Sequence, residues 1–158
     1  MIGKMMITAA FVAVLMVSQT ALAEGQFGTA DEAKAMLIKT AAAVKADRAK
    51  TLDLINKGEG GFLDRDIYPF CFDLSDGKIL AVANNNAKQN LGVDIRTLKD
   101  ATGRVYGPEL HAGAEKPDGQ ITEVSYMFPR PGADKTPVQK VSFVTRAGEM
   151  GCGVGYYK

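Results

Sequence analysis

The chain has 158 residues, a formal net charge of +1, two cysteines and one histidine. A near-neutral chain without a stripe of basic residues lacks the positively charged surface expected of a nucleic-acid-binding protein. With His111 as the only imidazole and no C-x-x-C spacing, a zinc or haem site also has little support. The length suits one domain with a single core.

Residues 1–23 have the three-part pattern of a secretory signal. A single basic residue, Lys4, precedes an apolar run over residues 5–17, and small residues end the segment at Ala23. The run is shorter than the ~20 residues that span a bilayer, although an uncleaved membrane anchor is the alternative. We predict cleavage after Ala23, one mature domain over residues 24–158, and a periplasmic or secreted location.

The two cysteines both lie in the predicted mature domain. An exported chain enters an oxidising compartment, where such a pair is usually joined. We therefore predict a disulfide between Cys71 and Cys152.

The first predicted element is one long helix from Ala30 to Asn56. Thr29 and Glu32 fit a capping box at its start, and Gly58 is a typical stop after its end. At ~1.5 Å per residue the helix would be ~40 Å long, so its first turns would project from a small sheet or pair with a partner; otherwise it simply covers the core. Residues at helical spacing form the stripe that can lie on the sheet, namely Met36, Leu37, Thr40, Ala41, Val44, Arg48, Leu52 and Ile55.

Five further stretches are predicted to be β-strands, the first two as an antiparallel hairpin and the last three as consecutive antiparallel strands. Ser75-Asp76-Gly77 supplies a hairpin turn between the first two, and short turns join the last three. Between the second and third strands, residues 84–119 are rich in asparagine and glycine, which favours a loop-rich lid with one or two short helices. The predicted strands are Ile67–Leu74, Ile79–Ala83, Ile121–Phe128, Val138–Arg146 and Met150–Tyr157. The fold class is therefore α+β.

Alternation along the strands gives each of them two different faces. One face of the first strand is an aromatic wall that consists of Tyr68, Phe70, Phe72 and Leu74. One face of the last strand is nearly bare, with Gly151, Gly153, Gly155 and Tyr157. The cysteines lie on the opposite face of each strand.

The order of these elements and several motifs resemble the single Cache domain, a PAS-like sensor module found outside the cytoplasm. The resemblance covers essentially all of the predicted mature chain. The chain is similar to the small stand-alone secreted type of Cache domain, because the sequence stops directly after the last strand. The motifs are Y-x-F-x-F-D-L-x-D-G-K-x-L-A over residues 68–81, Leu91–Asp100 with Gly103, the turn and strand from Pro129 to Lys140, and Cys152–Lys158.

The resemblance implies a long helix packed on a central five-stranded antiparallel sheet, with the last strand beside the first in its middle. It also implies a sensor of short organic acids or amino acids, bound on the sheet face away from the helix. In that arrangement the aromatic wall adjoins the glycine face. The two then form a hollow for a ligand, or the glycines merely ease strand twist and packing.

A short carboxylate needs a cation or several hydrogen-bond donors inside an otherwise apolar pocket. Lys140 would face this pocket if Val141 and Phe143 face the helix, and Arg65 could reach it from just before the aromatic strand. Either charge is otherwise a solvated residue at the sheet edge. The predicted ligand-binding residues are Lys140, Tyr126, Tyr68, Arg65, Phe70, Phe72, Ser142 and Gly153.

These patterns predict an exported sensor domain that binds a small molecule without catalysis, metal or cofactor. His111 lies in the lid and no nucleophile-elbow pattern is present, so Ser-His-Asp chemistry has little support. Signalling would pass through a homodimer or a membrane receptor that contacts the long helix. The alternatives are a secreted accessory protein with a vestigial pocket and, with less support, a hydrolytic enzyme.

Overall fold

The computed structural model describes residues 25–158, so the predicted signal segment and its cleavage site lie outside the described residues. Five antiparallel strands form one sheet in the order β2-β1-β5-β4-β3. The predicted sheet, with the last strand beside the first, is confirmed. The strands are β1 (Pro69–Asp73), β2 (Ile79–Val82), β3 (Thr122–Pro129), β4 (Pro137–Ala147) and β5 (Met150–Tyr157).

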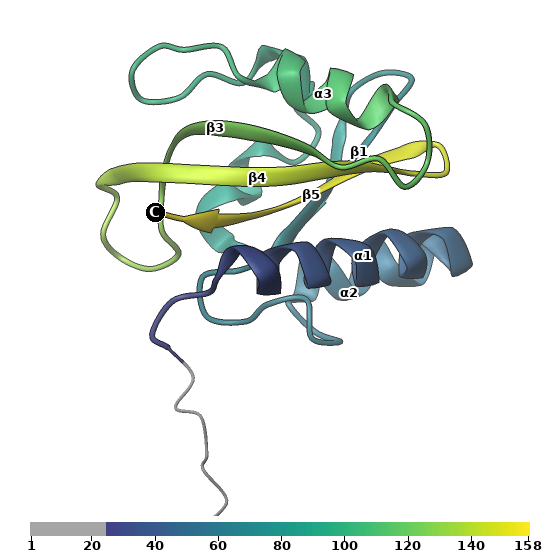
Figure 1. Ribbon diagram of the computed structural model, residues 1–158, viewed down its shortest axis with the longest axis horizontal. Helices are drawn as coiled ribbons and strands as arrows, with labels where there is room; N and C mark the ends of the chain where they lie inside the picture. The colour runs from purple at the N-terminus through teal and green to yellow at the C-terminus, as the bar shows by residue number, and fades with distance from the viewer. Residues whose placement is uncertain (1–24) are drawn as a thin grey trace, which may run out of the picture.

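Helices cover both faces of the sheet (Figure 1). On one face, α1 packs on β4 and β5 while α2 packs on β2, and α3 lies on the opposite face. The helices are α1 (Ala30–Ala46), α2 (Arg48–Lys57), the short 3-10 helices η1 (Asn85–Asn90) and η2 (Ile95–Thr97), and α3 (Gly107–Glu115).

The prediction of a single long helix is wrong, because the helix breaks at Asp47. This residue has extended dihedral angles (φ −153°, ψ 91°), and its carboxylate accepts a hydrogen bond from a backbone N–H in the first turn of α2. A short polar side chain that competes for backbone groups ends one helix and caps the next. Across the break, the Thr51 hydroxyl donates to the Ala43 carbonyl. Ala33 is fully buried, so the first turns of α1 lie on the sheet and do not project.

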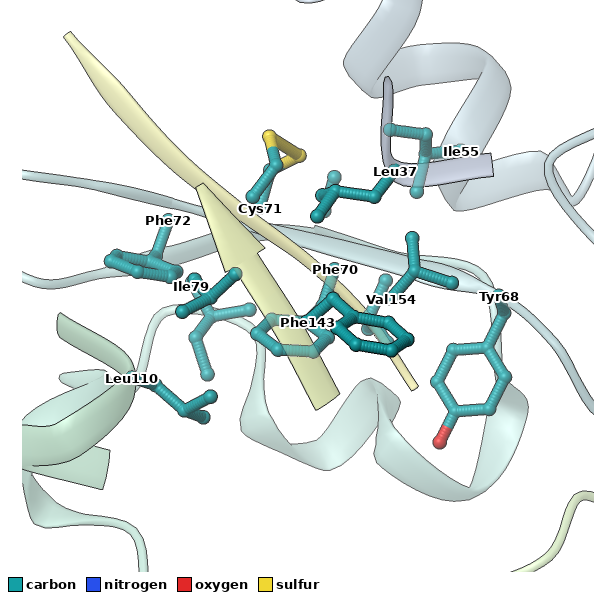
Figure 2. Close-up of a cluster of buried hydrophobic side chains, with 14 of the residues drawn as sticks. Leu37, Ile55, Tyr68, Phe70, Cys71, Phe72, Ile79, Leu110, Phe143 and Val154 are labelled. Carbon is teal, nitrogen blue, oxygen red and sulfur yellow. A yellow bond between two sulfur atoms is a disulfide. The ribbon is translucent and has the colours of Figure 1, made fainter. Parts of the chain in front are cut away.

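The two central strands are joined by the predicted disulfide. Cys71 lies directly opposite Cys152 in the register of β1 and β5, and their Cα atoms are 4.1 Å apart. Figure 2 shows Cys71 on the side of the sheet that faces Leu37 and Ile55 of the helices. Because the bridge links residues 81 positions apart, it stabilises the fold by about 4 kcal/mol on the chain-entropy account.

The glycine face and the aromatic face adjoin, but they do not form an open hollow. A side chain added at Gly153 would overlap the Phe70 ring, and one at Gly151 would overlap the Phe72 ring. At Gly155 the space is filled by the stem of Lys140. The glycines therefore make room for neighbouring side chains on the sheet. Of the two expectations from the sequence, this agrees with glycines that ease packing and not with an open hollow.

The lid over residues 84–119 is tied to the edge of β2. The Ile79 N–H donates to the Val93 carbonyl, and the Ile95 N–H donates to the Gly77 carbonyl. Farther along, α3 lies close to η2, and its first residue, Gly107, has no room for a side chain beside the Ile95 carbonyl. The lid is thus a packed layer over the sheet face that α1 and α2 leave free.

Candidate functional site

A cavity of about 40 Å³ lies between this sheet face and the lid. By this measure one water needs roughly 10–15 Å³, so the cavity has room for about three or four non-hydrogen atoms. Its walls are mostly aliphatic and aromatic, with one charged side chain. The lining residues are Tyr68, Phe70, Ile79, Val82, Ala87, Asn90, Leu98, Tyr106, Leu110, Tyr126, Phe128 and Lys140.

Lys140 of β4 carries that charge, and it is only 1% exposed. Its Nζ donates one hydrogen bond, to the Tyr68 hydroxyl at 2.7 Å, and lies 4.1 Å from the centre of the Tyr68 ring. The rings of Phe128 and Tyr157 are also near, at 5.2 and 5.1 Å. Burial lowers the pKa of Lys140 to about 7, while the more distant Asp66 opposes this shift.

The carboxylate of Asp66 is already bound to other groups. It accepts hydrogen bonds from the Gly28 N–H at 2.7 Å and from Arg130 Nε at 3.4 Å. Within residues 25–158, no carboxylate forms an ion pair with Lys140. A buried ammonium with one neutral partner reduces the stability of the fold, since the charge has lost its hydration and has no counter-ion.

A second polar group near the Tyr68 hydroxyl also lacks a partner. Asn84 is 3% exposed, and its side-chain oxygen caps η1 by accepting from the Asn86 N–H. Its Nδ2 finds no hydrogen-bond acceptor in the described part of the chain. Burial, and to a lesser degree the neighbouring Tyr157, raise the pKa of Tyr68 well above its usual value. Tyr68 is therefore a neutral phenol, and Asn84 is not among the residues that line the cavity.

Tyr126 joins the sheet to the lid. Its hydroxyl is 2.8 Å from the Ser142 hydroxyl, and its ring stacks on Tyr106 of the lid with centroids 3.9 Å apart and an interplanar angle of 5°. Burial raises the pKa of both tyrosines, so both are neutral phenols at physiological pH. The stack closes one end of the cavity.

The structure brings together half of the predicted site residues. Tyr68, Phe70, Tyr126 and Lys140 line the cavity. Of the others, Ser142 is buried behind Tyr126, Gly153 lies beneath the Phe70 ring, and Phe72 packs toward α3 with its centroid 5.9 Å from the His111 ring.

Arg65 lies outside the cavity because other groups use its guanidinium. Its Nη2 pairs with Glu32 at 2.7 Å and with Asp64 at 2.9 Å, and its Nη1 donates to the carbonyls of Gly25 and Phe27. The hydrogen bond from Arg65 lowers the pKa of Glu32 to about 2. Arg65 therefore fastens the segment before α1 to the start of that helix.

Sequence reasoning missed the contribution of the lid to the cavity wall. Five of the lining residues come from residues 84–119, namely Ala87, Asn90, Leu98, Tyr106 and Leu110. The predicted lid was the only sequence feature that pointed to these residues. Short 3-10 helices have no periodic pattern long enough to show which of their residues point inward.

No protein-family model matches the sequence, and no curated protein matches it significantly. Solved structures do match. One, described as the periplasmic sensor domain of a chemotaxis protein, has a TM-score of 0.58 and 22% identity, covering 80% of this chain and 88% of that one. A methyl-accepting chemotaxis protein from Vibrio parahaemolyticus matches with a TM-score of 0.62 and 20% identity, over 80% and 86%.

A third match concerns carboxylic acid recognition by a Cache chemosensory domain, with a TM-score of 0.57, 24% identity and coverage of 80% and 86%. These likenesses show that the chain has the fold of Cache sensor domains, as the sequence predicts. Across residues 25–158, no helix is long and apolar enough to cross a bilayer.

Proposed function

We propose that this protein is an exported sensor domain that binds one short carboxylate in the cavity between sheet and lid, without catalysis. The observation that carries the proposal is the buried ammonium of Lys140, which has one neutral partner and no counter-ion in the described residues. The ammonium carries three N–H donors, and one of them is used by the Tyr68 hydroxyl. A carboxylate has only acceptor atoms, so it complements this surplus of donors.

The size of the cavity limits the ligand. Room for about three or four non-hydrogen atoms fits acetate, while propionate needs a small movement of the lid. A dicarboxylate would place a second negative charge near aromatic walls, with no second cation to receive it. One structural neighbour is a Cache chemosensory domain described by its recognition of carboxylic acids, which supports the same ligand class.

The proposal of binding without catalysis is supported by how the candidate groups are used. His111 does not line the cavity; its Nε2 is 3.1 Å from the Leu74 carbonyl, and its Nδ1 is 3.6 Å from Glu115. Tyr68 and Tyr126 are held as neutral phenols. Hydrolysis also needs a group that activates water, and the proposal gives that role to no residue of the cavity lining.

A contiguous set of contacts leads from the cavity to the segment before α1. The hydroxyls of Tyr68 and Tyr157 are 3.4 Å apart, and Tyr157 donates to the Pro129 carbonyl. The Arg130 guanidinium lies over the rings of Tyr157 and Phe27, at 5.1 and 4.3 Å. A ligand that moves Lys140 or Tyr68 would thereby shift this N-terminal segment, which would contact a receptor or a second copy of the chain.

Ligand-dependent melting tests the proposal. Acetate and propionate should raise the melting temperature of the mature protein, since a ligand at about 100 times its Kd adds about 2.7 kcal/mol. Acetamide, which matches acetate in shape but has no charge, should not. The Lys140→Met variant should lose the acetate effect and the matched Lys99→Met variant, at an exposed lysine, should keep it. Equal shifts in both variants would place the anion elsewhere.

A further inference from the structure

Carboxylate binding uses only the protonated form of Lys140 and leaves the reactivity of its neutral amine unused. An anion requires the protonated ammonium, but a lysine without a counter-ion in an apolar cavity also exists as the neutral amine. The groups that surround Nζ are the Tyr68 hydroxyl at 2.7 Å, the rings of Tyr157 and Phe128, and the more distant Asp66. None of them is a carboxylate in contact that would hold a proton on the nitrogen.

We infer that the cavity captures small aldehydes or ketones as a reversible imine on Lys140, with Tyr68 as the group that transfers protons. This inference uses the cavity of the proposed function but not its chemistry, so each can fail without the other. It assigns to the domain a second ligand class, namely small reactive carbonyl compounds.

The chemistry balances with the groups that are present. The lone pair of Nζ forms a bond to the carbonyl carbon as the C=O π bond breaks, and the oxygen takes a proton from Tyr68, which recovers one from Nζ. The carbinolamine then loses its hydroxyl as water with the remaining Nζ proton, leaving a C=N bond. The sum is an aldehyde and an amine giving an imine and one water, with no oxidant or reductant.

Geometry and burial both favour this step. Tyr68 is a neutral phenol whose oxygen is within hydrogen-bond distance of Nζ, so it can give and recover a proton without a change of position. The cavity holds about three or four non-hydrogen atoms, which fits acetaldehyde or glycolaldehyde. Aromatic walls limit the access of water, which would hydrolyse the imine.

Protonation distinguishes Lys140 from the exposed lysines. An ordinary lysine in water is neutral at pH 7 in about one molecule of a few thousand. At a pKa of about 7, Lys140 is neutral in about half of the molecules. Lys99 and Lys116 are exposed and serve as controls within the same chain.

Reductive trapping tests the inference. The mature protein is incubated at pH 7 with acetaldehyde and cyanoborohydride, which adds hydride to the imine carbon, and labelled peptides are quantified by mass spectrometry. Lys140 should be ethylated at least about tenfold faster than Lys99 and Lys116. A rate at Lys140 no faster than that of the exposed lysines would overturn the inference, whether or not acetate binds.

A variant separates the role of Tyr68 from that of the cavity. Tyr68→Phe keeps the ring but removes the proton-transferring hydroxyl, so labelling of Lys140 should slow by about tenfold while labelling of Lys99 stays the same. Melting curves verify that the variant is folded. An unchanged rate at Lys140 in the folded variant would overturn the assignment of Tyr68.

Discussion

Arg65 and Lys140 are both cations close to β1, but they differ in what surrounds the charge. Arg65 is bound to the carboxylates of Glu32 and Asp64 and to two backbone carbonyls. Lys140 is deeper in the protein and has one neutral hydroxyl as its partner. The difference teaches that a cation satisfied by the chain itself stabilises the fold, whereas a buried cation left unsatisfied reduces stability until a ligand arrives.

The largest effect that this comparison predicts is a gain of stability on removing the lysine charge. Without ligand, Lys140→Met should raise the free energy of unfolding at pH 7 by on the order of 3 kcal/mol, because methionine fills the site without a buried ammonium. Chemical denaturation of both proteins in acetate-free buffer measures it. A variant less stable than the wild type would mean that the charge is already satisfied.

A second substitution tests how tightly the cavity wall is packed. Gly153→Val would force the Phe70 ring out of its position, so we expect a loss of roughly 1–3 kcal/mol in stability and weaker acetate binding. Valine favours strands more than glycine does, so packing and not strand propensity causes the loss. Urea unfolding and calorimetry measure the two effects. A variant that keeps both wild-type values would show that the space above Gly153 is open.

The pH dependence separates the two cations further. Only protonated Lys140 binds a carboxylate, so acetate affinity should fall above pH 7 by up to about tenfold per pH unit. Without ligand, the unfolded chain holds more protons than the folded one between pH 7 and about 10, so stability should rise with pH over this range. Tyr68, Tyr157, Asp66 and Arg130 surround the site, and the tyrosines stay neutral throughout the lower part of the range. Flat affinity from pH 6 to 9 would contradict the assignment.

The smallest effect is expected at Arg65. Arg65→Met should lower the free energy of unfolding only slightly, since its partners Glu32 and Asp64 are partly exposed and solvent weakens the ion pairs. Acetate affinity should stay the same, because Arg65 does not line the cavity. Calorimetry with acetate measures this. A clear loss of affinity in a folded variant would show that the two cations are coupled.

The strands could be predicted because alternation and turn residues are local signals, and the disulfide could be predicted because the predicted mature domain has two cysteines and is exported. Alternation separated Tyr68 from Cys71 within the first strand, the resemblance to Cache domains supplied the neighbouring strand, and the register of β1, β5 and β4 agrees with both. The break at Asp47 could not be predicted, since aspartate also occurs inside helices and only the tertiary contacts of α2 with β2 favour the bend.

The candidate site was predictable only in part. The stack of Tyr106 on Tyr126 joins segments that no short-range pattern relates. The sequence does not tell whether Arg65 or Lys140 is free to bind a ligand. That depends on the ion pair between Arg65 and Glu32, which are 33 positions apart. The row of glycines indicates close packing, but the sequence does not tell whether a ligand or the Phe70 ring occupies the space.

The most direct test of the central claim is the pKa of Lys140 measured by NMR on protein labelled with ¹³C-lysine, without and with acetate. Without acetate the pKa should be about 7, because burial disfavours the charge. With saturating acetate it should rise by at least one unit, because the carboxylate stabilises the ammonium, while the signal of Lys99 should not respond. A Lys140 pKa that saturating acetate leaves unchanged would contradict the account.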